Sequence, residues 1–224
     1  MALSNFTKNY GITPGIFPNA NRRDFTHNSG SAQSDKVLLA VVTMANNRNF
    51  SGTHAKYNGV TMTRHFNKNF SGLGQRQAVY SLINPSDGSN NFQVFFNGDQ
   101  YSLVSIACYT FIGCSGVGST GVSGGSSTPN TKALTCSANS IIMLTGISIS
   151  SQAGQVYTIS GSNYSLLFQH NTNDQVAAVL STNVAAGSVT CQTKVGSGNV
   201  TNVRVEMLEA SAPPSGNSGN FLMM

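Results

Sequence analysis

Short hydrophobic runs, each followed by turn-forming residues, recur through the middle of the chain. The run Val37–Met44 is continuous and rich in β-branched residues, which is typical of a strand buried on both faces. In Gln75–Asn84, Asn91–Asn97 and Tyr101–Ile112 hydrophobic and polar positions alternate instead, and a period of two predicts strands whose alternate side chains share one face. We find no amphipathic helix, heptad run or internal repeat in the sequence. The pattern predicts an all-β protein.

Turn residues between the runs favour the same interpretation. Asn58-Gly59 separates two short runs, and this dipeptide supplies the two positive-φ positions of a tight hairpin. Pro85-Ser-Asp-Gly88 is typical of a turn between strands. With roughly eleven strands at this spacing, the chain is expected to form an antiparallel, jelly-roll-like β-sandwich. Residues 113–130 are rich in Gly, Ser and Thr and are interpreted as a mobile surface loop.

The two ends of the chain differ from the central sandwich, which we place at residues 37–209. Residues 1–36 are interpreted as an extended N-terminal arm that lies against its own domain or against a neighbour. Residues 210–224 have the composition of a flexible C-terminal tail. Its last apolar residues either plug into a neighbouring subunit or form a frayed end. The residues expected to bind partners are Phe6, Tyr10, Ile12, Ile16, Phe17, Arg22, Arg23, Phe25, Phe221, Leu222, Met223 and Met224.

Composition and charge add two expectations about partners. Charged residues make up 8% of the chain, and Asn, Ser, Thr and Gly take their place. Such an uncharged polar surface is common in proteins that pack against copies of themselves, so we expect a homo-oligomer. Residues 1–76 hold nine basic and two acidic side chains and therefore carry a charge of +7. This segment either faces an acidic partner or forms a solvated basic edge.

Residues able to perform catalysis are few and scattered. A glycosidase needs two carboxylates held a few ångströms apart, and the seven carboxylates show no such pair in the sequence. His54 and His65 flank the predicted hairpin and could face each other across it, although exposed strand histidines are the simpler interpretation. The sequence has no CxxC pair for zinc and no P-loop lysine. We therefore expect no enzymatic activity, no metal and no cofactor.

The sequence also bears on binding to membranes, nucleic acids and glycans. No apolar run approaches the ~18 residues of a membrane span, and the basic residues are too scattered to indicate nucleic-acid binding. A glycan remains a candidate ligand, which could stack on the tyrosines Tyr57, Tyr101, Tyr157 and Tyr164. The N-terminus lacks the pattern of a signal peptide, so the cysteines are expected to be free thiols, with Cys108 buried in a strand.

Four segments of the central region carry a resemblance to a known family. They are Gly59-Val-Thr-Met-Thr63, then Arg76-Gln-Ala-Val-Tyr-Ser-Leu-Ile-Asn-Pro-Ser-Asp-Gly88, then Phe92–Gly98 with Ser105–Gly113. This block resembles β-sandwich modules of bacteriophage virion proteins, including tail-fibre-like and capsid-decorating proteins. The resemblance brings no catalytic residues with it.

The resemblance implies a non-enzymatic virion structural protein that is assembled in the host cytoplasm. Its partners would be the major capsid protein or other virion proteins. Arms at both ends and a basic N-terminal third favour a capsid decoration, or cement, protein that binds neighbouring subunits through these arms. The alternative is a phage tail-fibre or receptor-binding adhesin that recognises a glycan.

Overall fold

A computed structural model describes residues 6–18, 22–45, 54–70, 74–96, 100–124, 130–146, 156–159, 164–168, 177–194 and 200–210. Every regular element within these ranges is a β-strand, and the strands run from β1 to β17. All of the strand pairs within these ranges are antiparallel. The antiparallel all-β fold expected from the sequence is confirmed, with more strands than the roughly eleven that hydrophobic runs indicate.

The first nine strands form a jelly roll. They are β1 (Phe6–Pro18), β2 (Arg22–Asn28), β3 (Lys36–Ala45), β4 (His54–Tyr57), β5 (Val60–Thr61), β6 (Thr63–Phe70), β7 (Gln75–Ile83), β8 (Ser89–Phe95) and β9 (Gln100–Ile112). Sheet A has the order β1-β9-β3-β7-β6 and sheet B the order β2-β8-β4-β5. The first strand pairs with the last, the second with the second to last, and the third with the third to last. This is the nested strand pairing of a jelly roll. The additional strand β6 lies at the edge of sheet A.

The remaining strands repeat this topology, although no repeat is visible in the sequence. They are β10 (Cys114–Ser123), β11 (Asn130–Cys136), β12 (Ser140–Gly146), β13 (Val156–Ile159), β14 (Tyr164–Phe168), β15 (Ala177–Val184), β16 (Gly187–Lys194) and β17 (Asn202–Glu209). Sheet C has the order β10-β17-β12-β15-β14 and sheet D the order β11-β16-β13. The nested pairs are again present, and only the innermost pair is missing because β14 joins β15 in sheet C.

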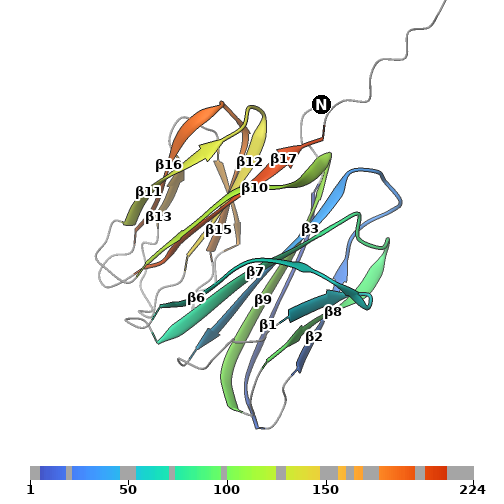
Figure 1. The fold of residues 1–224 in the computed structure, drawn as a ribbon. Coiled ribbons are helices and arrows are strands. Elements are labelled where there is room, and N and C mark those ends of the chain that lie inside the picture. The colour runs from blue at the N-terminus through green and yellow to red at the C-terminus, as the bar shows by residue number, and fades with distance from the viewer. Residues whose placement is uncertain are drawn as a thin grey trace, which may run out of the picture.

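The four sheets stack in the order B, A, C, D, with one hydrophobic core at each of the three interfaces (Figure 1). The first core lies between sheets B and A, and the third between sheets C and D. The second core joins the two jelly rolls, because it contains Leu39 and Phe111 from sheet A together with Val205 and Met207 from sheet C. Sheets A and C are therefore covered by cores on both of their faces, and sheets B and D each keep one outer face.

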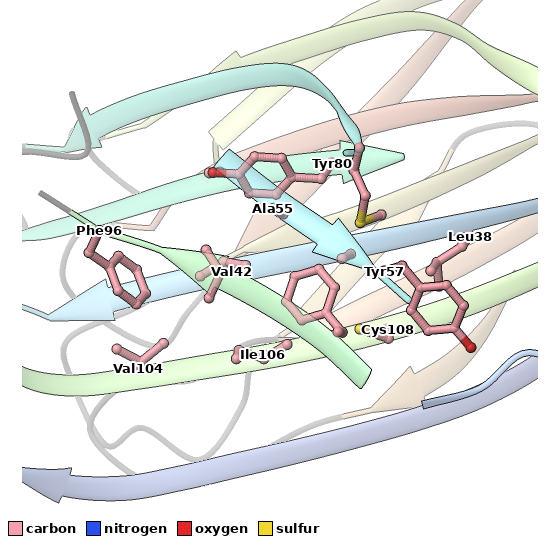
Figure 2. Close-up of a cluster of buried hydrophobic side chains, with 14 of the residues drawn as sticks. Leu38, Val42, Ala55, Tyr57, Tyr80, Phe96, Val104, Ile106 and Cys108 are labelled. Atoms are coloured by element: carbon pink, nitrogen blue, oxygen red, sulfur yellow. The ribbon is translucent and has the colours of Figure 1, made fainter. Parts of the chain in front are cut away.

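Strand β3 illustrates how the sequence produces this stack. Its side chains alternate, so that Leu38 and Val42 enter the core with sheet B while Leu39 and Val41 enter the core with sheet C. Figure 2 shows the first of these cores, with the side chains of β3 and β9 facing Ala55 and Tyr57 of β4. The continuous apolar run at residues 37–44 was predicted to be buried on both faces, and this prediction is confirmed.

The glycine-rich segment corrects one expectation. Cys114–Ser123 form strand β10, paired with β17, and not a mobile surface loop. Two of its glycines leave room for large buried side chains: a Cβ atom at Gly118 would lie 2.4 Å from Glu206 Oε2, and one at Gly121 would lie 2.4 Å from Arg204 Nη2. Glycine is needed at these positions because the Glu206 and Arg204 side chains fill the space that a Cβ atom would take. The composition of the segment alone does not distinguish this requirement from the flexibility of a loop.

The predicted hairpin at Asn58-Gly59 is present, and both residues have positive φ values, 48° and 79°. It joins only β4 to the two-residue strand β5, with Lys56 opposite Thr61 and Tyr57 opposite Val60. The chain then crosses to sheet A, where β6 pairs with β7. His54 and His65 consequently belong to different sheets and do not face each other across the hairpin.

Candidate interaction surfaces

The predicted N-terminal arm is extended, and its backbone lies against its own domain. Strand β1 pairs with β9 from Phe6 opposite Phe111 to Pro18 opposite Gln100, with an irregularity between Pro14 and Phe17. It is the edge strand of sheet A. The side chains proposed as partner contacts on this strand lie outside the described residues; they are Phe6, Tyr10, Ile12, Ile16 and Phe17. The domain limits at residues 36 and 209 stay predictions.

Strand β2, which also belongs to the predicted arm, is built into sheet B. Arg22 is exposed and forms a two-point ion pair with Asp24, with Nε 2.9 Å from Oδ1 and Nη2 3.0 Å from Oδ2. Arg23 is buried and Phe25 packs against the core between sheets A and B. Of these three predicted contact residues, Arg22 is exposed, Phe25 is half-buried and Arg23 is buried. The apolar residues Phe221, Leu222, Met223 and Met224 lie outside the described residues.

The first residue of β1 and the residue after β17 both lie near the link between β9 and β10. Phe6, where the described part of β1 begins, lies opposite Phe111, and the Ala210 amide, just after β17, donates to the Gly113 carbonyl oxygen at 2.8 Å. Ile83 is 55% exposed. Its side chain lies beside Gly116 of β10, because a Cβ atom on Gly116 would lie 3.9 Å from Ile83 Cδ1. We call Phe6, Ile83, Gly113 and Ala210 the junction site, because it lies where the two jelly rolls meet.

Several charged side chains form ion pairs or hydrogen bonds in the interior of the fold. The Lys36 ammonium is buried, pairs with the Asp87 carboxylate and donates to the Ser31 carbonyl oxygen at 3.2 Å. Glu206 is also buried, and its two carboxylate oxygens accept the Ser119 and Ser137 amides at 2.8 Å and 2.5 Å. These contacts hold strands and turns together, so part of the positive charge counted at residues 1–76 does not reach the surface.

The four cysteines are buried free thiols. Burial raises the pKa of Cys114 and Cys136 to about 12 and that of Cys191 to about 11. The pKa of Cys108 is raised as well, for the same reason. A nucleophilic cysteine requires a lowered pKa and access to substrate, and these thiols have neither. They act as small apolar residues of the three cores.

His27 lies between the two sheets of the first jelly roll. Its Nε2 is 2.7 Å from Thr110 Oγ1 on β9, and its ring meets that of Tyr57 edge to face with centroids 6.2 Å apart. Burial lowers the pKa of His27 to about 4, because a charged imidazole would be poorly solvated there. His65, which lies 2.7 Å from Ser81 Oγ through its Nε2, has a pKa lowered by burial in the same direction.

We expect His27 to make the protein less stable in acid. Its pKa is lower in the folded than in the unfolded chain, so its contribution is fully present above pH 6.5 and is lost as the pH falls toward about 4. The loss amounts to at most about 3 kcal/mol, taking ~1.4 kcal/mol for each pH unit. Urea unfolding between pH 7 and 4 measures it. The His27→Gln variant should show a flatter profile than the wild type, whereas His54→Gln should not; parallel profiles for all three proteins would contradict the assignment.

The outer face of sheet B collects a different set of side chains. His54 stacks on Phe95 with ring centroids 4.4 Å apart and an interplanar angle of 8°, and the Lys56 ammonium lies 5.8 Å from the Phe95 centroid. Arg22, Phe95 and His54 occupy one row across the sheet, and Asp24, Gln93 and Lys56 occupy the next. All six side chains are exposed or half-buried. We call these six residues the sheet B face.

The tyrosines that were predicted from the sequence to stack on a glycan do not belong to this face. Tyr57 is fully buried, and its hydroxyl donates to the His27 carbonyl oxygen at 3.0 Å, so it cannot stack on a sugar. The side chains of Tyr101, Tyr157 and Tyr164 lie outside the described residues. Phe95 was not proposed, although the alternation of Phe92, Val94 and Phe96 already placed it on the opposite, outward side of its strand. That outward aromatic residue was the available signal.

Comparison with known proteins finds no matching family profile, no matching curated protein and no matching solved structure. The chain is an all-β protein made of several antiparallel sheets packed as sandwiches. Within the described ranges, no three His, Cys, Asp or Glu side chains cluster as metal ligands would. The same ranges contain no helix with the length and apolarity required to cross a bilayer.

Proposed function

We propose that this protein is a non-enzymatic structural component of a bacteriophage virion, a decoration protein that binds neighbouring subunits on the capsid. Jelly rolls occur widely in viral capsids and in lectins, but a fold alone does not define a function. The observation that carries the proposal is the junction site. The C-terminal segment, which holds the four apolar residues predicted to reach a neighbour, leaves the described chain there after Ala210, on the side of β10 that adjoins exposed Ile83. We place the protein on particles that are assembled in the host cytoplasm.

Surface chemistry supports the same proposal. Ile83 and Val60 are the exposed large hydrophobic residues of the described chain, and Ile83 is the one at the junction site. Buried apolar anchors carry most of the binding energy of protein interfaces, so Ile83 is a suitable anchor for a capsid or other virion protein. Exposed Arg64 and Lys68 on the edge strand β6 add positive charge that suits an acidic shell. A homo-oligomer on the particle surface would use the same contacts between copies.

A binding assay with particles tests the proposal. Virus particles produced without this protein are mixed with purified protein, and occupancy is measured by co-sedimentation and electron microscopy. We expect saturable binding that falls at least tenfold for Ile83→Asp and for a variant with serine at positions 221–224. Val60→Asp is the matched control, since it places the same charge on the other exposed apolar residue, and it should bind like the wild type. Absence of wild-type binding, or equal binding by all variants, would overturn the proposal.

A glycan-binding adhesin is the second candidate function. The specific observation in its favour is the sheet B face, where an aromatic ring lies among polar side chains on a flat, uncovered surface. This surface belongs to the first jelly roll and contains none of the residues that define the junction site. Attachment to a particle and recognition of a glycan would therefore use separate parts of the molecule.

A further inference from the structure

We infer that the sheet B face binds an acidic polysaccharide, with the sugar rings on Phe95 and His54 and a carboxylate on Lys56. The inference gives a ligand class to the second candidate function and does not depend on attachment to a particle. The two outer faces of the stack, on sheets B and D, differ in their side chains. The described outer face of sheet D presents small polar and apolar side chains, namely Thr131, Ala133, Thr135, Ser188, Thr190 and Gln192. Among the side chains that the structure describes on these two outer faces, those of sheet B include an aromatic ring and charges.

The ring pair provides a stacking surface. Phe95 and His54 lie on neighbouring strands with their rings stacked face to face, nearly parallel at 8°. Each ring covers one face of the other, so a sugar would meet the outer side of the pair, where His54 is exposed. Packing against each other restricts both rings, so little side-chain entropy remains to be lost when a ligand covers them. Pyranose rings offer an apolar face of C–H groups, and aromatic rings with their negative faces accept such contacts. A half-buried phenylalanine on an otherwise polar sheet face is well suited to this purpose.

Oriented polar groups lie directly beside the rings. Gln93 donates from Nε2 to Asp24 Oδ1 at 3.4 Å, and the Arg22 guanidinium holds the same carboxylate through two contacts. Asp24, Gln93, Lys56 and Thr61 are in register on the four strands of sheet B. With strands ~4.8 Å apart, this row spans roughly 14 Å, which is the length of two to three sugar units. A few fixed polar groups beside an apolar platform are what orients a small ligand.

The balance of charge selects an acidic ligand. Asp24 is paired with Arg22, whereas Lys56 makes no ion pair among the residues that the structure describes. Its ammonium is held near the Phe95 ring, and a sugar on that ring would bring a ring carboxylate within its reach. A uronic acid unit of a polysaccharide suits this arrangement, because its ring can contact the aromatic pair while its carboxylate contacts the Lys56 ammonium.

Affinity electrophoresis and biolayer interferometry test the inference. The probes are polygalacturonate and alginate as carboxylated polysaccharides, dextran as a neutral one, and single-stranded DNA as a polyanion without sugar carboxylates. We expect the wild type to bind at least one carboxylated probe more tightly than dextran or DNA. Phe95→Ala should weaken this binding at least tenfold, and Phe95→Tyr should retain it. Lys56→Gln should abolish the preference over dextran, whereas Lys132→Gln, which removes an exposed cation from sheet D, should behave like the wild type.

Three results would overturn the inference. The first is no binding to either carboxylated probe at high protein concentration. The second is equal binding by wild type and Phe95→Ala, with circular dichroism and thermal unfolding showing that both are folded. The third is an equal loss with Lys132→Gln and Lys56→Gln, or equal binding of DNA, because binding would then follow overall charge. Particle binding by the Phe95→Ala variant separates this site from the decoration proposal, since it should remain at the wild-type level.

Discussion

Replacing Phe111 with alanine is expected to lower the free energy of unfolding by about 4 kcal/mol and to weaken both jelly rolls at once. The side chain is fully buried in the core between sheets A and C, where it shares one hydrophobic cluster with Val205 and Met207. Truncating a buried phenylalanine removes its transfer free energy and leaves a cavity, which typically destabilises a protein by about 3–5 kcal/mol. Because the cavity lies between the two units, both units lose packing in the core that they share.

Hydrogen exchange measured by mass spectrometry distinguishes this shared core from two independent cores. We expect Phe111→Ala to reduce amide protection in β12 of the second unit as well as in β3 of the first. Val60→Ala, on an exposed residue of the first unit, should leave both segments unchanged. Unchanged protection of β12 in the Phe111 variant would show that the two jelly rolls fold as separate units, contrary to the common core.

Gly118→Ala is expected to destabilise the protein by about 4 kcal/mol, although only one methyl group is added. The new Cβ atom would lie 2.4 Å from Glu206 Oε2 and 2.8 Å from Leu208 Cδ2, so both side chains have to move. Glu206 is buried and receives two backbone amides, and hydrogen bonds to a charged group contribute about 1.5–3 kcal/mol each. Moving the carboxylate also leaves the Ser119 and Ser137 amides without their acceptor.

The matched control is Gly116→Ala on the same strand. Its Cβ atom would meet only Ile83 Cδ1, at 3.9 Å, so the change should be neutral or stabilise the protein by up to about 1 kcal/mol. Urea unfolding of both variants measures the contrast. A double-mutant cycle with Glu206→Ala adds a second measurement, because the effect of Gly118→Ala should become smaller once the carboxylate is gone and only the contact with Leu208 is left. Similar stabilities for the two glycine variants would rule out the steric role of Gly118.

The candidate surfaces could be anticipated only in part. The outward position of Phe95 follows from the alternation of its strand, but its stacking partner His54 lies on β4, which is far from β8 in the sequence. Arg23 and Phe25 were expected to bind partners, and they turn toward their own core because β2 is a strand of sheet B. Exposure of a side chain depends on which sheet its strand joins, and the residues of the arm do not encode that.

The sequence by itself determined the class of fold and the inward face of many strands. A period of two places alternate side chains on one face, and Ala78, Tyr80, Val94 and Ile106 from three of these predicted strands do meet in one core. The positive-φ turn at Asn58-Gly59 is equally local. These features depend on neighbouring residues alone, and for that reason they are visible in the order of the amino acids.

Only the tertiary structure decided how the strands are shared among four sheets and that the jelly roll occurs twice. The pairs β1·β9 and β10·β17 close the two units across about a hundred residues, and such pairing depends on contacts that no local pattern records. The same reason explains the glycine-rich strand. Gly118 and Gly121 are required by Glu206 and Arg204, which lie far along the chain and reach them only when β17 pairs with β10.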